Sequence, residues 1–384
     1  MAGEYGVNVD KQKDFDAWKT SHQPFHWFVD FYGIMNAGGF DVIIGNPPYL
    51  ELRQVNYAPR SFQTCESGAV HAMCIERSLM LLNVSGAISM IVPLALVSTQ
   101  RMTVVQRLLE AQSLTWYANF SWRPGKLFDT VNRALTIFVA CRPSLAVDRT
   151  WSTNYQKWNS DTRGDLIPTM TYCQVKRGRS SFWVPKLGDP VEQAILAKLL
   201  ASKASFSDFI GKSGNVIYYR TTGGLYWKVF TDFAPAFRCN GKSGHSSRET
   251  TLALAKPAYI KSAIAVLSSN IFWWWYTITS NLRDLNPSDI RGYPVTESVL
   301  SDQKLIALGD QYLCNLKQNS TMLVRQQKQT GKTETQSFKV QKSKPILDGI
   351  DAVLAEHYGL LLGRVADWLH CSRIARRRPT KMPL

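Results

Sequence analysis

A short apolar segment that ends in two consecutive prolines lies near the start of the chain, "FDVIIGNPPY" over residues 40–49. Two glycines before it supply a turn. A continuous apolar run of this length is typical of a strand buried in a parallel sheet. Proline lacks a backbone N–H, so Pro47 and Pro48 end the strand and keep the following chain extended. The segment therefore predicts a buried parallel strand with an open turn at its carboxyl end.

Further strand and helix candidates alternate with this segment. Apolar spacing predicts a helix over residues 68–83, and Ser98 is expected to cap a second helix. Strands are predicted at residues 87–92, 114–120 and 134–140. Such alternation favours an α/β fold with an open, Rossmann-like sheet and crossover helices.

The composition changes near residue 175, and we expect three regions. Residues 1–175 are predicted to form part of the α/β sheet. Residues 176–298 open on a basic connector, and Pro190 follows an aspartate in a typical helix start, which predicts a separate α+β domain. Residues 299–384 are predicted to form a helical C-terminal region that ends in a basic tail.

Three segments of these last two regions give more specific expectations. The aromatic run "FWWWY" at residues 272–276 is expected to form the core of its domain, because so many adjacent aromatic side chains cannot all face solvent. A polar stretch between Lys317 and Lys344 is expected to be a mobile excursion. Apolar spacing over residues 346–360 predicts a final helix.

The distribution of charge suggests a partner. The chain has 45 Lys and Arg residues against 29 Asp and Glu residues, a formal net charge of +16. The first 50 residues are acidic on balance, and the basic excess lies mainly after residue 150. A basic excess of this kind is expected of a protein that binds a polyanion such as nucleic acid. The alternative is a basic surface without such a partner.

Metal, disulfide and membrane features are not indicated. The seven cysteines form no C-x-x-C pair, and the histidines show no metal-ligand spacing, so no metal is predicted. Scattered cysteines are typical of a reducing compartment, and we expect a cytoplasmic protein. The longest apolar run, residues 86–97, is shorter than the roughly 20 residues that a membrane helix needs.

The four residues Asn46, Pro47, Pro48 and Tyr49 form a site suited to a planar ring with an amino group. The carboxyl ends of parallel strands are where open α/β sheets bind ligands. The Asn46 side-chain oxygen and the Pro47 carbonyl can each accept one amine hydrogen. Tyr49 offers a face for stacking, worth roughly 1–3 kcal/mol for a nucleobase. The alternative is that these residues only form a turn after a strand.

The segment "FHWFVDFYGIMNAGGFDVIIGNPPYLE" strongly resembles the catalytic region of DNA adenine-N6 methyltransferases. The similar group includes type IIG restriction-modification enzymes and BREX-type phage-defence methyltransferases. The resemblance continues through "GAISMIVPLALVST" and "VNRALTIFVACRPS" into a target-recognition domain, over roughly residues 22–360. It implies a site-specific enzyme that transfers a methyl group from S-adenosylmethionine to an adenine flipped out of double-stranded DNA.

The resemblance also implies roles for the motif residues. Asn46 and Pro47 would hold the adenine amine, and Tyr49 would stack on the base. Release-factor glutamine methyltransferases and some ribosomal RNA guanine methyltransferases share a similar motif. A long basic and aromatic second region favours a DNA enzyme, which needs a domain to read bases and phosphates.

Residues that would contact DNA are harder to select from sequence. Arg220, in "YYRTTGG", and Arg283 and Arg291, on either side of "LNPSD", are our candidates. Each of them can equally be an ordinary solvated charge. Lys212 and Lys242 lie in "GKSG" segments that lack the leading glycine of a phosphate loop, so we expect plain loops there.

The main donor-binding part is not found in the sequence. In this fold the donor lies on strands that precede the motif strand, with a glycine-rich turn and an acidic residue for the ribose. Only 39 residues precede Phe40, and they contain no G-x-G. We therefore expect a methyltransferase fragment whose S-adenosylmethionine site is supplied by another chain or lost by truncation. The second hypothesis is a non-catalytic, DNA-binding remnant of a restriction-modification enzyme.

Overall fold

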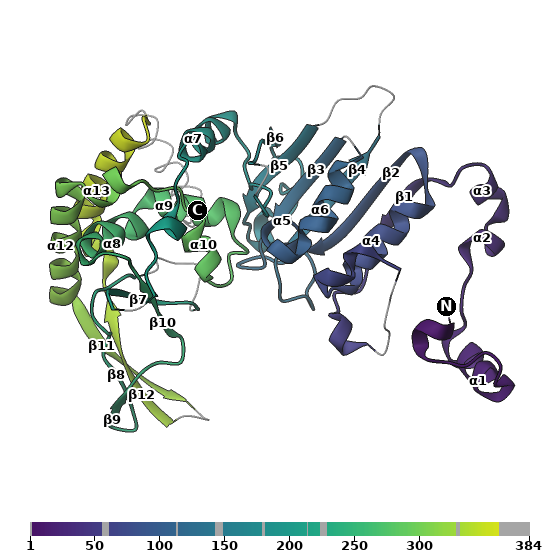
Figure 1. Ribbon diagram of the computed structural model, residues 1–384, viewed down its shortest axis with the longest axis horizontal. Coiled ribbons are helices and arrows are strands. Elements are labelled where there is room, and N and C mark those ends of the chain that lie inside the picture. Colours follow the sequence, from purple (N-terminus) through teal and green to yellow (C-terminus); the bar gives the residue numbers. More distant parts are fainter. Residues whose placement is uncertain are drawn as a thin grey trace, which may run out of the picture. The chain divides into compact units, whose positions relative to one another are not determined.

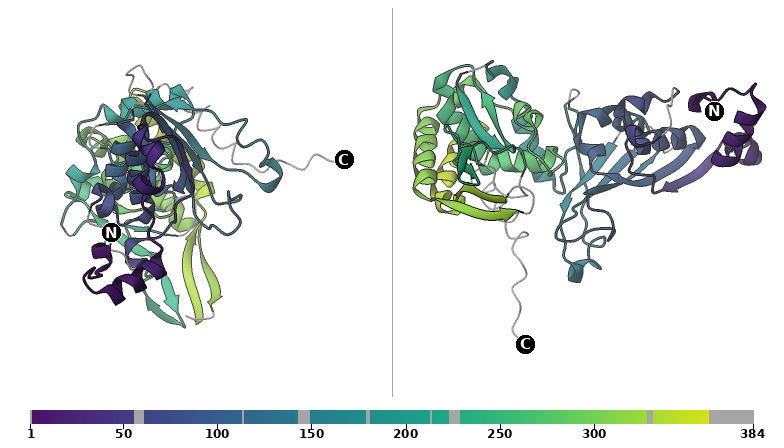
Figure 2. Two further views of the ribbon diagram at one scale, coloured as in Figure 1. Left: turned by 90° about the vertical axis from the view of Figure 1, so that its right-hand side faces the viewer. Right: turned by 90° about the horizontal axis from the view of Figure 1, so that it is seen from below.

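The computed structural model describes residues 2–55, 61–112, 114–142, 149–178, 181–212, 214–222, 229–327 and 331–360 (Figure 1; Figure 2). The chain divides into two compact units, Met1–Gln193 and Ala194–Leu384. The basic tail named above lies outside the described residues. In the described ranges, no helix is both long enough and apolar enough to cross a membrane.

The first unit contains a six-stranded sheet with the strand order β1-β2-β4-β3-β5-β6. Its strands are β1 (Phe40–Gly45), β2 (Leu82–Pro93), β3 (Leu114–Phe120), β4 (Leu135–Cys141), β5 (Arg149–Gln156) and β6 (Cys173–Gln174). β1 is parallel to β2, and β3 to β5, whereas β4 runs antiparallel to β2 and β3. The α/β class is confirmed. The sheet is mixed because β3 and β4 follow each other without a crossover helix.

The helices of the first unit are α1 (Gln12–His22), α2 (Trp27–Asp30), α3 (Tyr32–Asn36), α4 (Val70–Leu81), α5 (Ala95–Ser98) and α6 (Thr103–Glu110). α4 connects β1 to β2, and its Ala72 and Ile75 are fully buried. Figure 1 shows α4, α5 and α6 on one face of the sheet. The prediction that Ser98 caps the second helix is wrong. Ser98 closes α5, where its hydroxyl donates to the Leu94 carbonyl at 2.9 Å, and α6 begins only at Thr103.

The prediction that the first strand is buried is wrong. β1 is the last strand at one edge of the sheet and has β2 as its neighbour on one side. Val42 and Ile44 are 60% and 78% exposed. The apolar sequence is typical of a central strand. Among the described residues, however, no strand pairs with the outer edge of β1, and the side chains of Val42 and Ile44 stay exposed.

The second unit combines two small antiparallel sheets with a set of helices. One sheet pairs β7 (Val216–Arg220) with β10 (Glu249–Ala253). The other has the order β11-β12-β8-β9 and is built from β8 (Phe237–Cys239), β9 (Lys242–Gly244), β11 (Ser320–Gln327) and β12 (Gly331–Phe338). The helices are α8 (Ile260–Ser268), α9 (Asn270–Thr279), α10 (Pro287–Arg291), α11 (Glu297–Leu300), α12 (Gln303–Gln318) and α13 (Lys344–His357). Helix α7 (Pro190–Leu200) starts at the predicted proline and spans the boundary between the units.

Two expectations about this unit have opposite outcomes. The aromatic run lies in α9 and forms core, as predicted, since Phe272, Trp274, Trp275 and Tyr276 are at most 4% exposed. The prediction of a mobile excursion between α12 and α13 is wrong. That polar stretch forms the antiparallel pair β11–β12, which extends the ladder of β8. Backbone hydrogen bonds to neighbouring strands order it in place of an apolar core.

Candidate functional site

The four motif residues lie where the sequence places them, directly after β1. Gly45, the last residue of β1, pairs with Met90 of β2. The chain then leaves the sheet through Asn46, which is exposed, and Pro47, which is buried. Within the described residues, the Asn46 side chain makes no hydrogen bond, so its amide oxygen is available to a ligand. Pro48 is exposed and Tyr49 is half-buried.

Tyr49 is fixed at both its ends. Its hydroxyl donates to the Ile91 carbonyl of β2 at 3.1 Å, and its own carbonyl accepts from Nη1 of Arg133 at 3.5 Å. Burial raises the pKa of Tyr49 to about 12, against an opposing effect of Arg133. The phenol therefore stays protonated, and its hydrogen bond to the Ile91 carbonyl holds the ring in one orientation.

The segment after the motif is pinned by an ion pair. Arg101 donates to both carboxylate oxygens of Glu51, at 2.8 Å for the Nη2 to Oε1 bond. The hydrogen bonds of Arg101 hold the pKa of Glu51 below its ordinary value. Arg101 also donates to the Ser67 carbonyl at 3.0 Å. The backbone N–H of Leu52 donates to the Gly68 carbonyl at 2.8 Å, which closes the same loop.

His71 is a buried polar side chain at the start of α4, close to this ion pair. It is 3% exposed, and neither ring nitrogen has a hydrogen-bond partner among the described residues. Burial lowers its pKa to about 4, and the positive charges of Arg101 and Arg133 act in the same direction. The imidazole is therefore neutral at pH 7. The sequence analysis found neither His71, Arg133 nor the Glu51–Arg101 pair.

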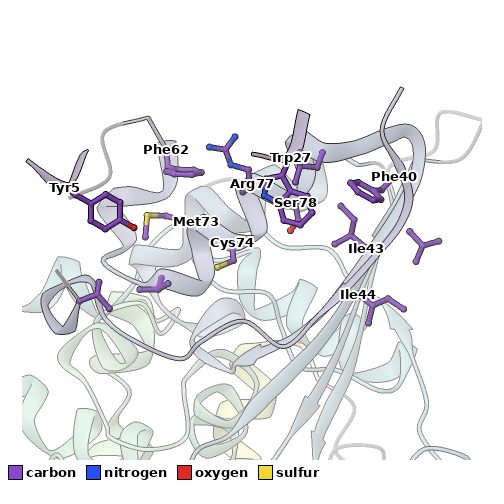
Figure 3. Close-up of a pocket in the computed structure, with 14 residues that line it drawn as sticks. Tyr5, Trp27, Phe40, Ile43, Ile44, Phe62, Met73, Cys74, Arg77 and Ser78 are labelled. Atoms are coloured by element: carbon purple, nitrogen blue, oxygen red, sulfur yellow. The ribbon is translucent and has the colours of Figure 1, made fainter. Parts of the chain in front are cut away.

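A hollow of about 680 Å³ lies beside β1 and α4 (Figure 3). Aromatic and aliphatic side chains line most of it, among them Trp27, Phe40, Phe62 and Met73. The guanidinium of Arg77 lies over the Phe62 ring at 5.0 Å and is the charged group of the described lining. Asn46 does not line this hollow. The surface of the hollow is suited to apolar groups.

The three arginines selected from sequence all lie in the second unit. Arg220 ends β7 and is half-buried, whereas Arg283 and Arg291 are exposed. Arg283 lies 3.7 Å from the carboxylate of its neighbour Asp284. The backbone N–H of Leu285 donates to the Thr221 carbonyl at 2.8 Å, which joins the segment of Arg283 to the end of β7.

Comparison with known proteins bears on the first unit. Residues 4–128 match the Eco57I restriction-modification methylase family. Over 42 residues, 11% of this chain, the sequence is 67% identical to a putative type II restriction enzyme and methyltransferase of Methanocaldococcus jannaschii. The matched segment covers 3% of that relative.

Two solved structures are similar over more of the chain. The type IIL restriction-modification enzyme MmeI in complex with DNA has a TM-score of 0.46 at 9% identity, over 87% of this chain and 57% of MmeI. The type ISP enzyme LlaGI, a nuclease-deletion mutant with a DNA substrate mimic, has a TM-score of 0.38 at 9% identity, over 77% and 44%. By sequence, the segment that contains the motif, residues 4–128, is similar to the Eco57I restriction-modification methylase family.

Proposed function

We propose that this chain takes part in site-specific methylation of adenine at N6 in DNA, with S-adenosylmethionine as the methyl donor. The observation that carries the proposal is the exposed and unbonded Asn46 side chain at the carboxyl end of β1, followed by buried Pro47. Its amide oxygen and the Pro47 carbonyl would each accept one hydrogen of the adenine amine. The match of residues 4–128 to a methylase family supports a methyl-transfer site.

The chemistry of this site follows from the amine it would hold. In free adenine the amine lone pair is delocalised into the ring, which makes N6 a weak nucleophile. Two acceptors that direct both N–H bonds toward Asn46 and Pro47 would draw the lone pair out of conjugation. The interaction strengthens as positive charge develops on nitrogen, so it favours the transition state over the bound base. Tyr49 would hold the flipped ring by stacking.

The hollow beside β1 does not fit S-adenosylmethionine. The donor has an ammonium group, a sulfonium group and ribose hydroxyls, which call for carboxylate and other polar partners. The described lining of the hollow contains no Asp or Glu and is mostly apolar. The hollow is therefore not the donor site.

We further propose that a partner segment outside the described residues, on this or another chain, supplies the donor site and adds a strand to the open edge of β1. The exposed Val42 and Ile44 support this, because parallel strands are normally covered on both faces. Helices α2 and α3 also bury none of their residues, although both contain apolar side chains. The same partner would cover them.

The identity of the methylated base tests the proposed function. The chain is incubated with tritiated S-adenosylmethionine and unmethylated genomic DNA, alone and with a donor-binding segment of an Eco57I-type methylase. The DNA is then digested to nucleosides and separated. We expect label in N6-methyldeoxyadenosine. Label in a methylated cytosine, or none although donor and DNA are both bound, would contradict the proposal. Label only with the added segment supports the partner.

A further inference from the structure

Three arginines from separate segments come together in the second unit. Arg220 ends β7, Arg248 directly precedes β10, and Arg325 lies on β11. Arg220 pairs in register with Glu249, the first residue of β10. The backbone N–H of Thr221 donates to the Arg248 carbonyl at 3.1 Å, which fixes these two segments beside each other. Figure 1 shows both sheets on the same side of the helices of this unit.

The charges of these arginines act on one another. Burial lowers the pKa of Arg220, and the charges of Arg248 and Arg325 lower it further. Glu249 opposes this effect. Its side chain is 9% exposed and lies 4.0 Å from Nδ1 of His245, and burial raises its own pKa. Arg220 thus lies within the influence of two other guanidinium groups and one carboxyl group, and positive charge remains in excess.

The cluster lacks the ion pairs that other basic residues make. Among the described residues, no carboxylate lies within salt-bridge distance of Arg220, Arg248 or Arg325. In contrast, Lys332 on the neighbouring strand β12 lies 2.9 Å from Glu334. Like charges that lie close together and are partly buried repel one another. This repulsion lowers the stability of the folded chain unless an anion neutralises the charges. A phosphate matches the planar donor fork of arginine and neutralises the charge.

The strand register extends this basic surface across the four-stranded sheet. One row of residues crosses this sheet from β11 to β9. In it, each residue lies directly opposite the next, in the order Arg325, Thr333, Cys239 and Lys242. Residues directly opposite one another share a face of the sheet, so Arg325 and Lys242 lie on the same face.

The adjacent row of residues occupies the other face. In it, Val324 lies opposite Glu334, Glu334 opposite Arg238, and Arg238 opposite Ser243. Arg238 is an exposed arginine of the same sheet that faces away from the cluster. It provides a matched control.

We propose that Arg220, Arg248 and Arg325 form one binding site for a backbone phosphate of double-stranded DNA. The choice of DNA as the polyanion rests on the proposed function. The site positions the duplex on the second unit without reading bases, because phosphate contacts contain no sequence information. Lys242 adds a further basic group at the other end of the same face.

The test is a salt titration of DNA binding by the full-length chain. Fluorescence anisotropy with a mixed-sequence duplex is measured at several salt concentrations for the wild type, Arg220→Gln, Arg248→Gln, Arg325→Gln and Arg238→Gln. Each cluster variant should weaken binding about tenfold and reduce the slope of log K against log[salt] by about one. Arg238→Gln should leave both unchanged. Arg248 and Arg325 are exposed, so their variants test the site even if Arg220→Gln fails to fold.

The outcomes separate this site from the proposed function. Unchanged slopes in the Arg248 and Arg325 variants, or an equal loss in Arg238→Gln, would overturn the site. Adenine methylation that persists with unchanged slopes overturns the site alone. Loss of DNA binding in the cluster variants of a chain that methylates no adenine keeps the site and defeats the proposed function. A wild-type chain that binds no DNA defeats both.

Discussion

At the scale of single residues, Asn46 and Tyr49 have different surroundings and therefore different expected roles. Asn46 is exposed and unbonded within the described chain, whereas the Tyr49 hydroxyl is already used by the Ile91 carbonyl at 3.1 Å. The ring of Tyr49 is what remains for a base. This hydrogen bond was not foreseen from the sequence, because its two residues are 42 positions apart.

Substitutions at Tyr49 separate its ring from its hydroxyl. Tyr49→Phe loses one hydrogen bond, worth about 1 kcal/mol, and keeps the stacking face. Methyl transfer should fall only a few-fold. Tyr49→Ala also loses stacking of about 1–3 kcal/mol, and the KM for DNA should rise roughly 10- to 100-fold. Equal losses in the two variants would mean that the hydroxyl, and not the ring face, acts on the base.

His71 predicts a dependence of stability on pH. Its pKa is about 4 in the folded chain, against an ordinary value of 6.5. Above about pH 7.5 the imidazole is mostly uncharged in both the folded and the unfolded chain. As the pH falls from about 6.5 toward 4, the unfolded chain takes up the proton first, so stability is lost, by about 2 kcal/mol at pH 5.

The comparison variant is His71→Leu, which fills the same buried place without a titratable group. Urea denaturation near pH 7.5 and pH 5 should show the wild type losing about 2 kcal/mol more than His71→Leu between the two conditions. The same loss in both proteins would show that His71 is not the group that titrates.

Sequence patterns were informative about the motif but not about its surroundings. Asn46 to Tyr49 are adjacent in the chain, so their spacing is visible in the sequence. Arg133 contacts Tyr49 from 84 positions away, and Arg101 contacts Glu51 from 50 positions away. Such contacts depend on how β4 and the loop before α6 pack against β2, which no local pattern records.

At the scale of elements, β1 shows what an apolar pattern reports and what it does not. The pattern correctly predicted a strand over residues 40–45 and its parallel pairing with the next strand. The pattern could not show how many strands pair with β1. Apolar side chains indicate a preference for burial, but they do not show that another strand or helix is there to bury them. The β11–β12 pair gives the reverse case, since polar side chains concealed a regular ladder.

The open edge of β1 predicts self-association. Val42→Lys combined with Ile44→Lys puts charge on an exposed, apolar edge strand, which discourages edge-to-edge pairing. Sedimentation velocity at rising concentration should show less association than in the wild type. Because both side chains are exposed, the free energy of unfolding should change by less than about 0.5 kcal/mol.

Ile167→Lys is the control for this pair. Ile167 is 68% exposed and lies away from the β1 edge, between β5 and β6. The Ile167→Lys substitution also adds positive charge but leaves the edge strand unchanged, so self-association should stay as in the wild type. An equal decrease in Ile167→Lys would attribute the effect to net charge and not to β1.

At the scale of the whole molecule, the two units divide the proposed work. The first unit holds the motif in its mixed sheet, and residues 4–128 match a methylase family. The second unit contains the arginine cluster and much of the positive charge. Composition suggested a polyanion partner, but it could not show that Arg220 lies beside Arg248, since that requires the pairing of β7 with β10.

The central claim is that Asn46 holds the adenine amine during methyl transfer. Single-turnover methyl transfer and DNA affinity are measured side by side for the wild type, Asn46→Ala and Asn46→Asp, under the conditions that give transfer. Asn46→Ala should slow the chemical step by about 100-fold and change the DNA Kd by less than about threefold. Asn46→Asp keeps an acceptor oxygen and should retain more of the rate. A wild-type rate in Asn46→Ala, or equal losses of rate and affinity, would contradict the account.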